Sequence, residues 1–134
     1  MMSSSAPSWV NRALLWIPPI VYAALIFHFS SESDPLPALT EAVWDKALHA
    51  VEYGGLAFLV CRALRGEGCG WPKACLLAAV VACAYALSDE WHQGMVPGRD
   101  SDIRDWVADT SGGSLGVILY WLAARRPRAR PTES

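Results

Sequence analysis

The fold of this chain depends on the segment from Asp89 to Asp109, whose sequence is DEWHQGMVPGRDSDIRDWVAD. Six of its residues are acidic and two are Arg, yet the flanking segments Ala74–Leu87 and Gly112–Ala124 carry no charge. A charged segment between two apolar ones is typical of a loop at a membrane surface. Its acidic residues also extend into the helices expected on both sides. Ionisable groups are costly there and usually have a function.

The composition of the whole chain agrees with a membrane protein. The chain has 134 residues, of which 53% are hydrophobic, and seven are Trp. This length indicates one domain, and the apolar fraction exceeds that of an average soluble protein. The net charge of -2, with basic residues that form no single stripe, argues against nucleic-acid binding.

The first expected membrane helix covers Ala13–Phe29. It holds no charged residue over a length near the minimum of about seventeen that can span a bilayer. Pro18 and Pro19 predict a kink rather than a break, because membrane helices tolerate proline. A cleaved signal peptide is the alternative, with Arg12 as its basic region. No small-x-small cleavage motif follows the segment, so we expect it to be retained.

Two further helices carry polar residues on one side. The second expected helix runs from Asp45 to about Leu64, and at 100° per residue its polar positions share one sector of about 120°. These positions are Asp45, Lys46, His49, Glu52 and Tyr53. The third runs from Lys73 to about Gln93, and small residues at four-residue spacing lead into its acidic end. They are Ala74, Ala78, Ala82 and Ala86. Rows of small residues let membrane helices approach closely, so this row aims the acidic end at the bundle interior.

The fourth expected helix begins near Asp102. Its Asp105, Asp109, Gly112 and Gly116 share one face, and the two glycines form a Gly-x-x-x-Gly pair. We expect these glycines to contact the alanine row of the third helix. The fold class predicted from the sequence is therefore an all-α bundle of four transmembrane helices with short loops.

The basic residues predict the orientation of this bundle. Four spans place eight of them on one side and three on the other, and the excess of positive charge marks the cytoplasmic side. The prediction divides the chain into a cytoplasmic tail (1–11), a four-helix membrane domain (12–124) and a basic cytoplasmic tail (125–134). Eleven of the thirteen acidic residues then lie at the outer ends of the helices or in the outer loops.

The polar residues at this outer level predict one pocket that opens outward. Candidate acid-base or catalytic groups are His49, Glu52, Asp89, Glu90, Gln93 and Asp105. Candidate groups for binding a substrate or an anion are Lys46, Tyr53, Arg99 and Asp109, and Arg99 has the planar fork that suits phosphate or carboxylate. His49 and Glu52, three positions apart and joined by Asp89 or Asp105, also fit a divalent cation. In the alternative interpretation the basic residues only neutralise the carboxylates and lock the helices together.

Three motifs at these positions are specific in combination, although each alone is weak. They are Asp45-Lys46-x-x-His49-x-x-x-Tyr53, Asp89-Glu90-x-x-Gln93 with Val96-Pro97-x-Arg99, and Asp105 with Gly112 and Gly116. Together with Ser30-Ser31 they make the chain resemble the VanZ-like family of small membrane proteins. The chain departs from the family pattern at Asp109, where Asn is usual, and at Glu32, where Gln is common. The resemblance implies a bacterial multi-pass membrane protein of the cell envelope, in a family named for a protein linked to teicoplanin resistance.

Two classes of function follow. The first is an enzyme or envelope factor that acts at the outer leaflet on a phospholipid headgroup, a lipid-linked glycan or a glycopeptide. The second is a membrane protein without catalysis that binds a partner or moves a small solute, with a structural polar cluster. A transporter needs charges through the depth of the bundle, and the charges here stop in the outer third. Whether a reaction is catalysed, the substrate, the metal and the oligomeric state are left open by the sequence.

Overall fold

The structure, a computed structural model, describes residues 8–32, 45–99 and 101–125, and these residues form four helices and no strand. The helices are α1 (Ser8–Ser30), α3 (Asp45–Gly66), α4 (Trp71–Gln93) and α5 (Ile103–Ala124). The predicted all-α fold with four helices is confirmed. α1 begins before Ala13 and continues through Pro18 and Pro19. The expected loop over 33–44 and most of both expected tails lie outside the described residues.

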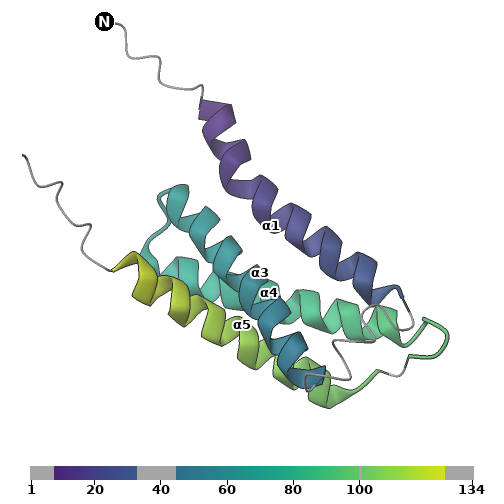
Figure 1. Ribbon diagram of the computed structural model, residues 1–134. Helices are drawn as coiled ribbons and strands as arrows, with labels where there is room; N and C mark the ends of the chain where they lie inside the picture. The colour runs from purple at the N-terminus through teal and green to yellow at the C-terminus, as the bar shows by residue number, and fades with distance from the viewer. Residues whose placement is uncertain (1–7, 33–44, 100, 126–134) are drawn as a thin grey trace, which may run out of the picture.

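α3 and α4 each contact the other three helices, and α3 makes the more extensive contacts with both α1 and α5. The most extensive contact is between α3 and α5, and α4 packs against both of them. α3 and α5 run in the same direction and α4 runs opposite to them (Figure 1). α1 lies along α3 and α4 and diverges from the bundle toward its N-terminal end. The end of α4 and the beginnings of α3 and α5 therefore meet at one end of the molecule.

The glycine pair of α5 packs against α3 and not against the alanine row of α4, which corrects the prediction. A Cβ at Gly112 would lie 2.6 Å from the carbonyl carbon of Ala50, and one at Gly116 would lie 2.7 Å from that of Gly54. Gly113 is the glycine that faces α4, where its Cβ would meet that of Ala82 at 3.1 Å. The spacing identified a close contact, but the partner depended on the tertiary arrangement. Backbone contact at glycine explains why α3 and α5 approach so closely.

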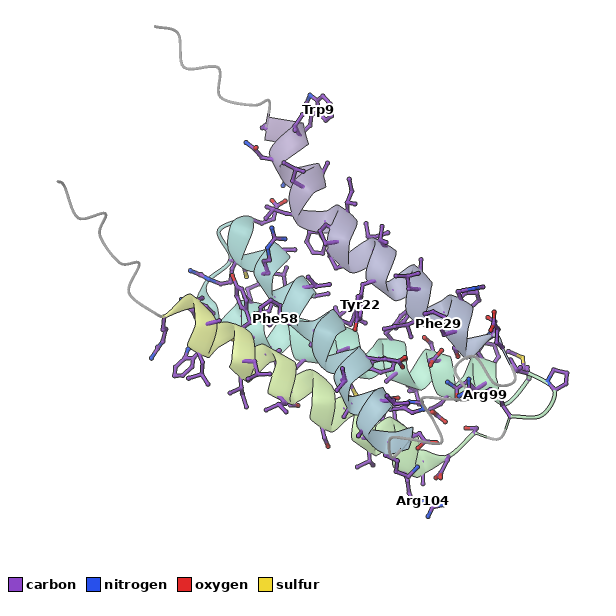
Figure 2. All side chains as sticks on the ribbon, viewed as in Figure 1. Trp9, Tyr22, Phe29, Phe58, Arg99 and Arg104 are labelled. Atoms are coloured by element: carbon purple, nitrogen blue, oxygen red, sulfur yellow. The ribbon has the colours of Figure 1, made fainter. Side chains whose placement is uncertain are left out.

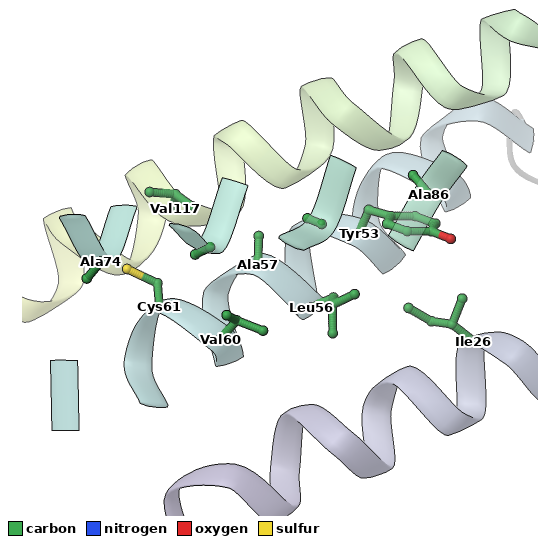
Figure 3. Packing of buried hydrophobic residues seen from close by; sticks show 11 residues of the cluster. Ile26, Tyr53, Leu56, Ala57, Val60, Cys61, Ala74, Ala86 and Val117 are labelled. Atoms are coloured by element: carbon green, nitrogen blue, oxygen red, sulfur yellow. The ribbon is translucent and has the colours of Figure 1, made fainter. Parts of the chain in front are cut away.

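The core between the helices consists of small residues with a few larger ones (Figure 3). The alanine row of α4 is buried to within 1% of full burial, so its predicted orientation toward the interior is confirmed. Tyr53, Leu56 and Ala57 of α3 pack on this row, and Ile26 joins them from α1. Large aliphatic side chains instead point outward on every helix, as with Ile20, Leu76 and Leu119. Small residues inside and large apolar residues outside are the arrangement expected in lipid.

Three of the four helices are long and apolar enough to cross a membrane: Ser8–Ser30, Lys46–Gly66 and Trp71–Gln93. The chain is thus consistent with a multi-pass membrane protein. α5 does not meet this standard, which departs from the predicted four spans. Its average hydropathy is lowered by Asp105, Asp109 and three glycines, yet all five are buried against the other helices. The mean hydropathy of a helix counts residues that face the other helices in the same way as residues that face outward, so buried polar residues lower the value for α5.

α1 is attached to the opposite end of the bundle by an ion pair. The guanidinium of Arg12 donates two hydrogen bonds to Glu67 Oε2, at 2.8 and 3.0 Å, and the Trp16 indole donates to Oε1 at 3.2 Å. These bonds hold the pKa of the Glu67 carboxyl below its usual range. Glu67 lies in the turn between α3 and α4, where Gly68 adopts a φ of 85° that suits glycine. The ion pair therefore joins the N-terminal half of α1 to this turn.

Candidate functional site

The buried polar side chains gather at the end of the bundle where α3 and α5 begin and α4 ends. The buried members are Ser30, His49, Asp89, Glu90, Gln93, Asp105 and Asp109. Figure 2 shows the oxygen and nitrogen atoms concentrated at this end, where Arg99 also lies. Burial of so many polar groups is costly unless they pair with one another or with a ligand. We call this set the polar end.

Lys46 ties the start of α3 to the start of α5. Its ammonium group forms a salt bridge with Asp105 and lies 3.6 Å from Oδ2 of Asp102. Asp102 is the N-cap of α5, and its side chain accepts a hydrogen bond of 2.9 Å from the backbone N–H of Arg104. This bond and a second one from the Arg104 guanidinium hold the pKa of Asp102 below its usual range. The Lys46 ammonium group is thus paired with the carboxylates of Asp102 and Asp105.

His49 and Asp109 form a second link between α3 and α5, deeper in the bundle. His49 Nδ1 lies 3.0 Å from Oδ1 of Asp109, and the two side chains are 7% and 0% exposed. The second carboxylate oxygen of Asp109 is buried and has no hydrogen-bond partner among the residues that the structure describes. A proton on Nδ1 fixes the orientation of the imidazole and leaves Nε2 as its other donor or acceptor atom. A paired His and carboxylate is a common acid-base arrangement.

α4 contributes the remaining carboxylates. The Gln93 amide donates to Asp89 at 3.0 Å, one turn back along the helix. Oε2 of Glu90 accepts the backbone N–H of Asp102 at 2.9 Å and the Ser101 hydroxyl at 3.3 Å. Oε1 of Glu90 is buried, again with no hydrogen-bond partner in the described part of the chain. Glu90 therefore binds the loop before α5 through Oε2, and its Oε1 can still accept a hydrogen bond or bind a cation.

Three of these groups are close enough to share an ion. His49, Glu90 and Asp109 each offer one ligand atom, and the three atoms lie within 4.8 Å of one another. Among the residues that the structure describes, this is the group of three or more His, Cys, Asp or Glu side chains whose ligand atoms lie this close together. The chelate predicted from the sequence was different, because it joined His49 to Glu52 and to Asp89 or Asp105. The interhelical packing brings Asp109 and Glu90 to His49 instead.

The other predicted site residues lie around this centre. Tyr53 is fully buried, with its ring 6.3 Å from that of Tyr85. Glu52 is half-buried and interacts electrostatically with His49 and with Arg99. Arg99 follows the turn at Gly98, whose φ is 84°, and its guanidinium donates to the backbone carbonyl of Glu32 at 3.3 Å. The predicted return of Arg99 over the polar end thus brings it to the end of α1.

The sequence prediction missed one member of the polar end and two residues that hold it in place. Ser30 of α1 is 4% exposed and buries its hydroxyl there. Ser101 and Asp102 hold Glu90 and Lys46 through the bonds described above. Asp102 carried a usable signal, because Asp is favoured at the N-cap and binds the backbone of the first turn. Ser30 entered the sequence prediction only through the Ser30-Ser31 resemblance, because nothing in its spacing relates it to the other polar residues.

Two hollows adjoin the polar end. A cavity of about 320 Å³ lies between α1 and α4 and is lined by Phe27, Tyr85, Ser88, Asp89, Trp91, His92 and Met95. A groove of about 260 Å³ lies between α3 and α5 and is lined by Ala50, Val51, Gly54, Gly55, Phe58, Gly112, Leu115, Gly116 and Leu119. The groove is apolar and open to the outside, because Val51, Leu115 and Leu119 are all more than half exposed. It starts beside His49 and Asp109, since Ala50 and Gly112 follow them on the same two helices.

Among comparisons with known proteins, the one with protein-family models gives a match. No curated protein and no solved structure matches the chain. The model of the VanZ/LLP1 family matches residues 3–124, which include all four helices and every member of the polar end. The resemblance noticed in the sequence is thus confirmed, and the chain belongs to the VanZ/LLP1 family.

Proposed function

We propose that this protein acts in the cell envelope on an amphiphile, a phospholipid or a lipid-linked glycan, whose headgroup reaches the polar end while its chain lies in the groove between α3 and α5. The observation that carries the proposal is that the two features are neighbours along α3 and α5, since Ala50 of the groove follows His49 and Gly112 of the groove lies three residues after Asp109. An apolar groove leads along two helices to a buried group of carboxylates, one histidine and one lysine. A soluble ligand would use the polar part alone, whereas a lipid uses both.

The dimensions of the groove suit a hydrocarbon chain. Its lining on α3 extends from Ala50 to Phe58, eight residue steps apart, which is about 12 Å at the rise of an α-helix. Its lining includes the glycines at 54, 55, 112 and 116, which present no side chain to the groove. An acyl or isoprenoid chain gains about 0.8 kcal/mol per CH₂ group removed from water, but in a bilayer it gains only packing contacts. Such a groove therefore selects a lipid by shape and leaves its headgroup to supply the affinity.

The polar end offers donors and acceptors for that headgroup. Asp89 lines the cavity together with the aromatic rings of Phe27 and Trp91, and this lining suits sugar hydroxyls or an ammonium group. The His49–Asp109 pair supports acid-base chemistry on such a group, and Arg99 supports recognition of a phosphate near the end of α1.

Lipid retention by the purified protein tests the proposal. Leu115→Trp fills the groove, and Ile118→Trp on the same helix is the matched control, since Ile118 is about equally exposed and does not line the groove. Overfilling costs about 1–3 kcal/mol, so the retained lipid should fall roughly tenfold or more for Leu115→Trp. Mass spectrometry of the extracted lipid measures this. Equal retention by both variants would exclude the groove as the lipid site.

We also propose that α5 spans the membrane beside the other three helices, with the polar end outside the cell. Its outward residues, such as Leu115 and Leu122, are apolar, which supports a position in lipid. The excess of basic residues toward the other end supports cytoplasmic termini. Reporter fusions after Arg126 and in the loop at Gly98 test this topology. A C-terminal reporter that works only outside the cell contradicts it.

A second function class is favoured by a specific observation, namely the Lys46 salt bridge to Asp105. In this alternative the protein binds a partner without catalysis, and the charges at the polar end only join α3 to α5. The two classes differ in the effect of His49→Ala. A catalytic or headgroup role predicts a changed lipid or cell-wall profile from a folded variant, whereas the structural role predicts a less stable protein with an unchanged profile once it is folded.

A further inference from the structure

We propose that His49, Glu90 and Asp109 form a binding site for a divalent metal ion of the Mn²⁺ or Zn²⁺ type. The inference goes beyond the headgroup proposal, because a metal here could serve binding, catalysis or the stability of the bundle. It assigns one centre to three helices. The ligands come from the second turn of α3, the last turn of α4 and the second turn of α5.

The distances fit a shared ion. Two ligand atoms bound to one metal at about 2.1 Å lie roughly 3.0–3.4 Å apart in octahedral or tetrahedral geometry. His49 Nδ1 and Asp109 Oδ1 are 3.0 Å apart and share a hydrogen bond, so a bound ion would replace the proton between them. The three ligand atoms lie within 4.8 Å of one another, so they have to approach by roughly 1–2 Å at most to reach the spacing of ligands on one ion. The helices that carry the ligands are already packed against one another.

Unsatisfied oxygens provide an independent observation. Glu90 and Asp109 are 4% and 0% exposed, and each has one carboxylate oxygen that is buried and finds no hydrogen-bond donor in the described residues. A buried carboxylate oxygen without a partner costs roughly 1–3 kcal/mol or more. Two such oxygens beside one imidazole are the pattern that a metal ion would satisfy. If hydrogen bonds within the cluster were its only stabilising contacts, we would expect each of these two oxygens to have a donor.

The charge balance of the site points the same way. The negative charges of Asp89 and Asp105 act on Asp109, and His49 is the group that opposes them. Glu90 in turn feels Asp105 and Asp109, with His49 as the opposing group. Lys46 is held by Asp105 and Asp102 at the rim. A divalent cation among these groups compensates carboxylates that would otherwise repel one another at low dielectric.

The ligand chemistry selects the class of metal. One imidazole nitrogen with two carboxylate oxygens suits Mn²⁺ or Zn²⁺ better than Ca²⁺ or Mg²⁺, which favour oxygen ligands alone. Three protein ligands leave further coordination positions for water or for an oxygen of a bound headgroup. An ion in this place would act as a Lewis acid toward a phosphate or a carbonyl oxygen.

Mn²⁺ binding to the purified, EDTA-treated full chain in detergent tests the proposal. Mn²⁺ is the better probe because the four free cysteines prefer softer ions such as Zn²⁺. Electron paramagnetic resonance follows the loss of the free Mn²⁺ signal, and thermal unfolding follows stabilisation by the ion. We expect one bound ion per chain and a melting temperature that rises with Mn²⁺ concentration.

The variants Glu90→Gln and Asp109→Asn keep the size of each side chain, and each should weaken Mn²⁺ binding at least about tenfold. Glu52→Gln is the matched control, because Glu52 lies on the same helix as His49 and is not one of the three ligands. It should leave the affinity within about threefold of the wild type, because its charge acts on the site without binding the ion. Circular dichroism checks that each variant is folded.

Two results would overturn the proposal. The first is a wild-type chain that takes up no Mn²⁺ and shows no thermal shift, which would mean that a proton satisfies the carboxylate pair. The second is a Glu52→Gln variant that loses the ion while Glu90→Gln and Asp109→Asn keep it, which would restore the chelate around Glu52. Neither result affects lipid retention by the groove, so the headgroup proposal is tested separately.

Discussion

The closest contact in the bundle makes Gly116→Ala the most informative substitution for the fold. A methyl group at this position would lie 2.7 Å from the carbonyl carbon of Gly54 and 2.8 Å from its Cα. Both atoms belong to the backbone of α3, so no side chain can rotate away. Relief requires α3 and α5 to separate by about 1 Å, since carbon atoms pack at about 3.5–4.0 Å.

The magnitude follows from two opposing effects. Replacing a mid-helix glycine by alanine favours the helix by about 1 kcal/mol. Overpacking of a close contact costs about 1–3 kcal/mol, and the rigid partner places Gly116 at the upper end of that range. We therefore expect a net loss of about 2 kcal/mol. Gly113→Ala is the control, because its methyl group would meet the Ala82 side chain at 3.1 Å, and there the two effects should nearly cancel.

Chemical denaturation in mixed detergent micelles, followed by circular dichroism, measures both variants. We expect Gly116→Ala to be less stable than Gly113→Ala by about 2 kcal/mol. If Gly116→Ala is as stable as the wild type, α3 and α5 do not touch at this glycine. The parallel arrangement of the two helices would then have to be revised.

Three more predictions concern the polar groups. Lys46→Met should cost about 2 kcal/mol, because the buried Asp105 loses its salt bridge, and a double-mutant cycle with Asp105→Asn should show coupling between the two sites. Equal losses with no coupling would mean that the pair is solvated. The pKa of Glu67 is lowered in the fold, so its ion pair stabilises the protein above the ordinary glutamate pKa of about 4.3, and this contribution fades as the pH falls through the lower folded value. The difference in melting temperature between wild type and Glu67→Gln should therefore be present at pH 7 and shrink toward pH 3, and a constant difference would contradict the assignment. Arg99→Lys and Arg99→Ala should both remain folded and both lose the cellular phenotype if the guanidinium recognises an anion, and a fully active Arg99→Lys protein would show that only its charge matters.

Much of the architecture was predictable because the membrane restricts the possible structures. Uncharged segments have to become helices, and a row such as Ala78, Ala82 and Ala86 has to face another helix. The expected end of α4 at Gln93 is where the helix ends. The pairing of helices was less predictable, because a Gly-x-x-x-Gly motif indicates a close contact without naming its partner. Gly112 and Gly116 thus met α3 instead of α4.

The candidate site shows the same division. The helical periodicity and the hydropathy of each segment predicted that His49, Glu90 and Asp109 lie at one end of the bundle. This prediction needs only the sequence of each helix by itself. Which carboxylates reach His49 depends on the rotation and separation of three helices, so the sequence offered Glu52 where the structure offers Glu90 and Asp109. Glu52 is on the same helix as His49, and short sequence spacing made it the obvious candidate.

The parallel course of α3 and α5 has a consequence for biosynthesis. Lys46 and His49 find their partners Asp105 and Asp109 about sixty positions later in the chain. At a translation rate of about 5–20 residues per second, roughly 3–12 seconds pass between synthesis of the two halves. During that time α3 has to be accommodated with an ammonium group and an imidazole that lack their carboxylates. We expect α3 to stay near the aqueous boundary until α5 arrives, and a chain truncated before α5 would leave Lys46 and His49 without these carboxylates.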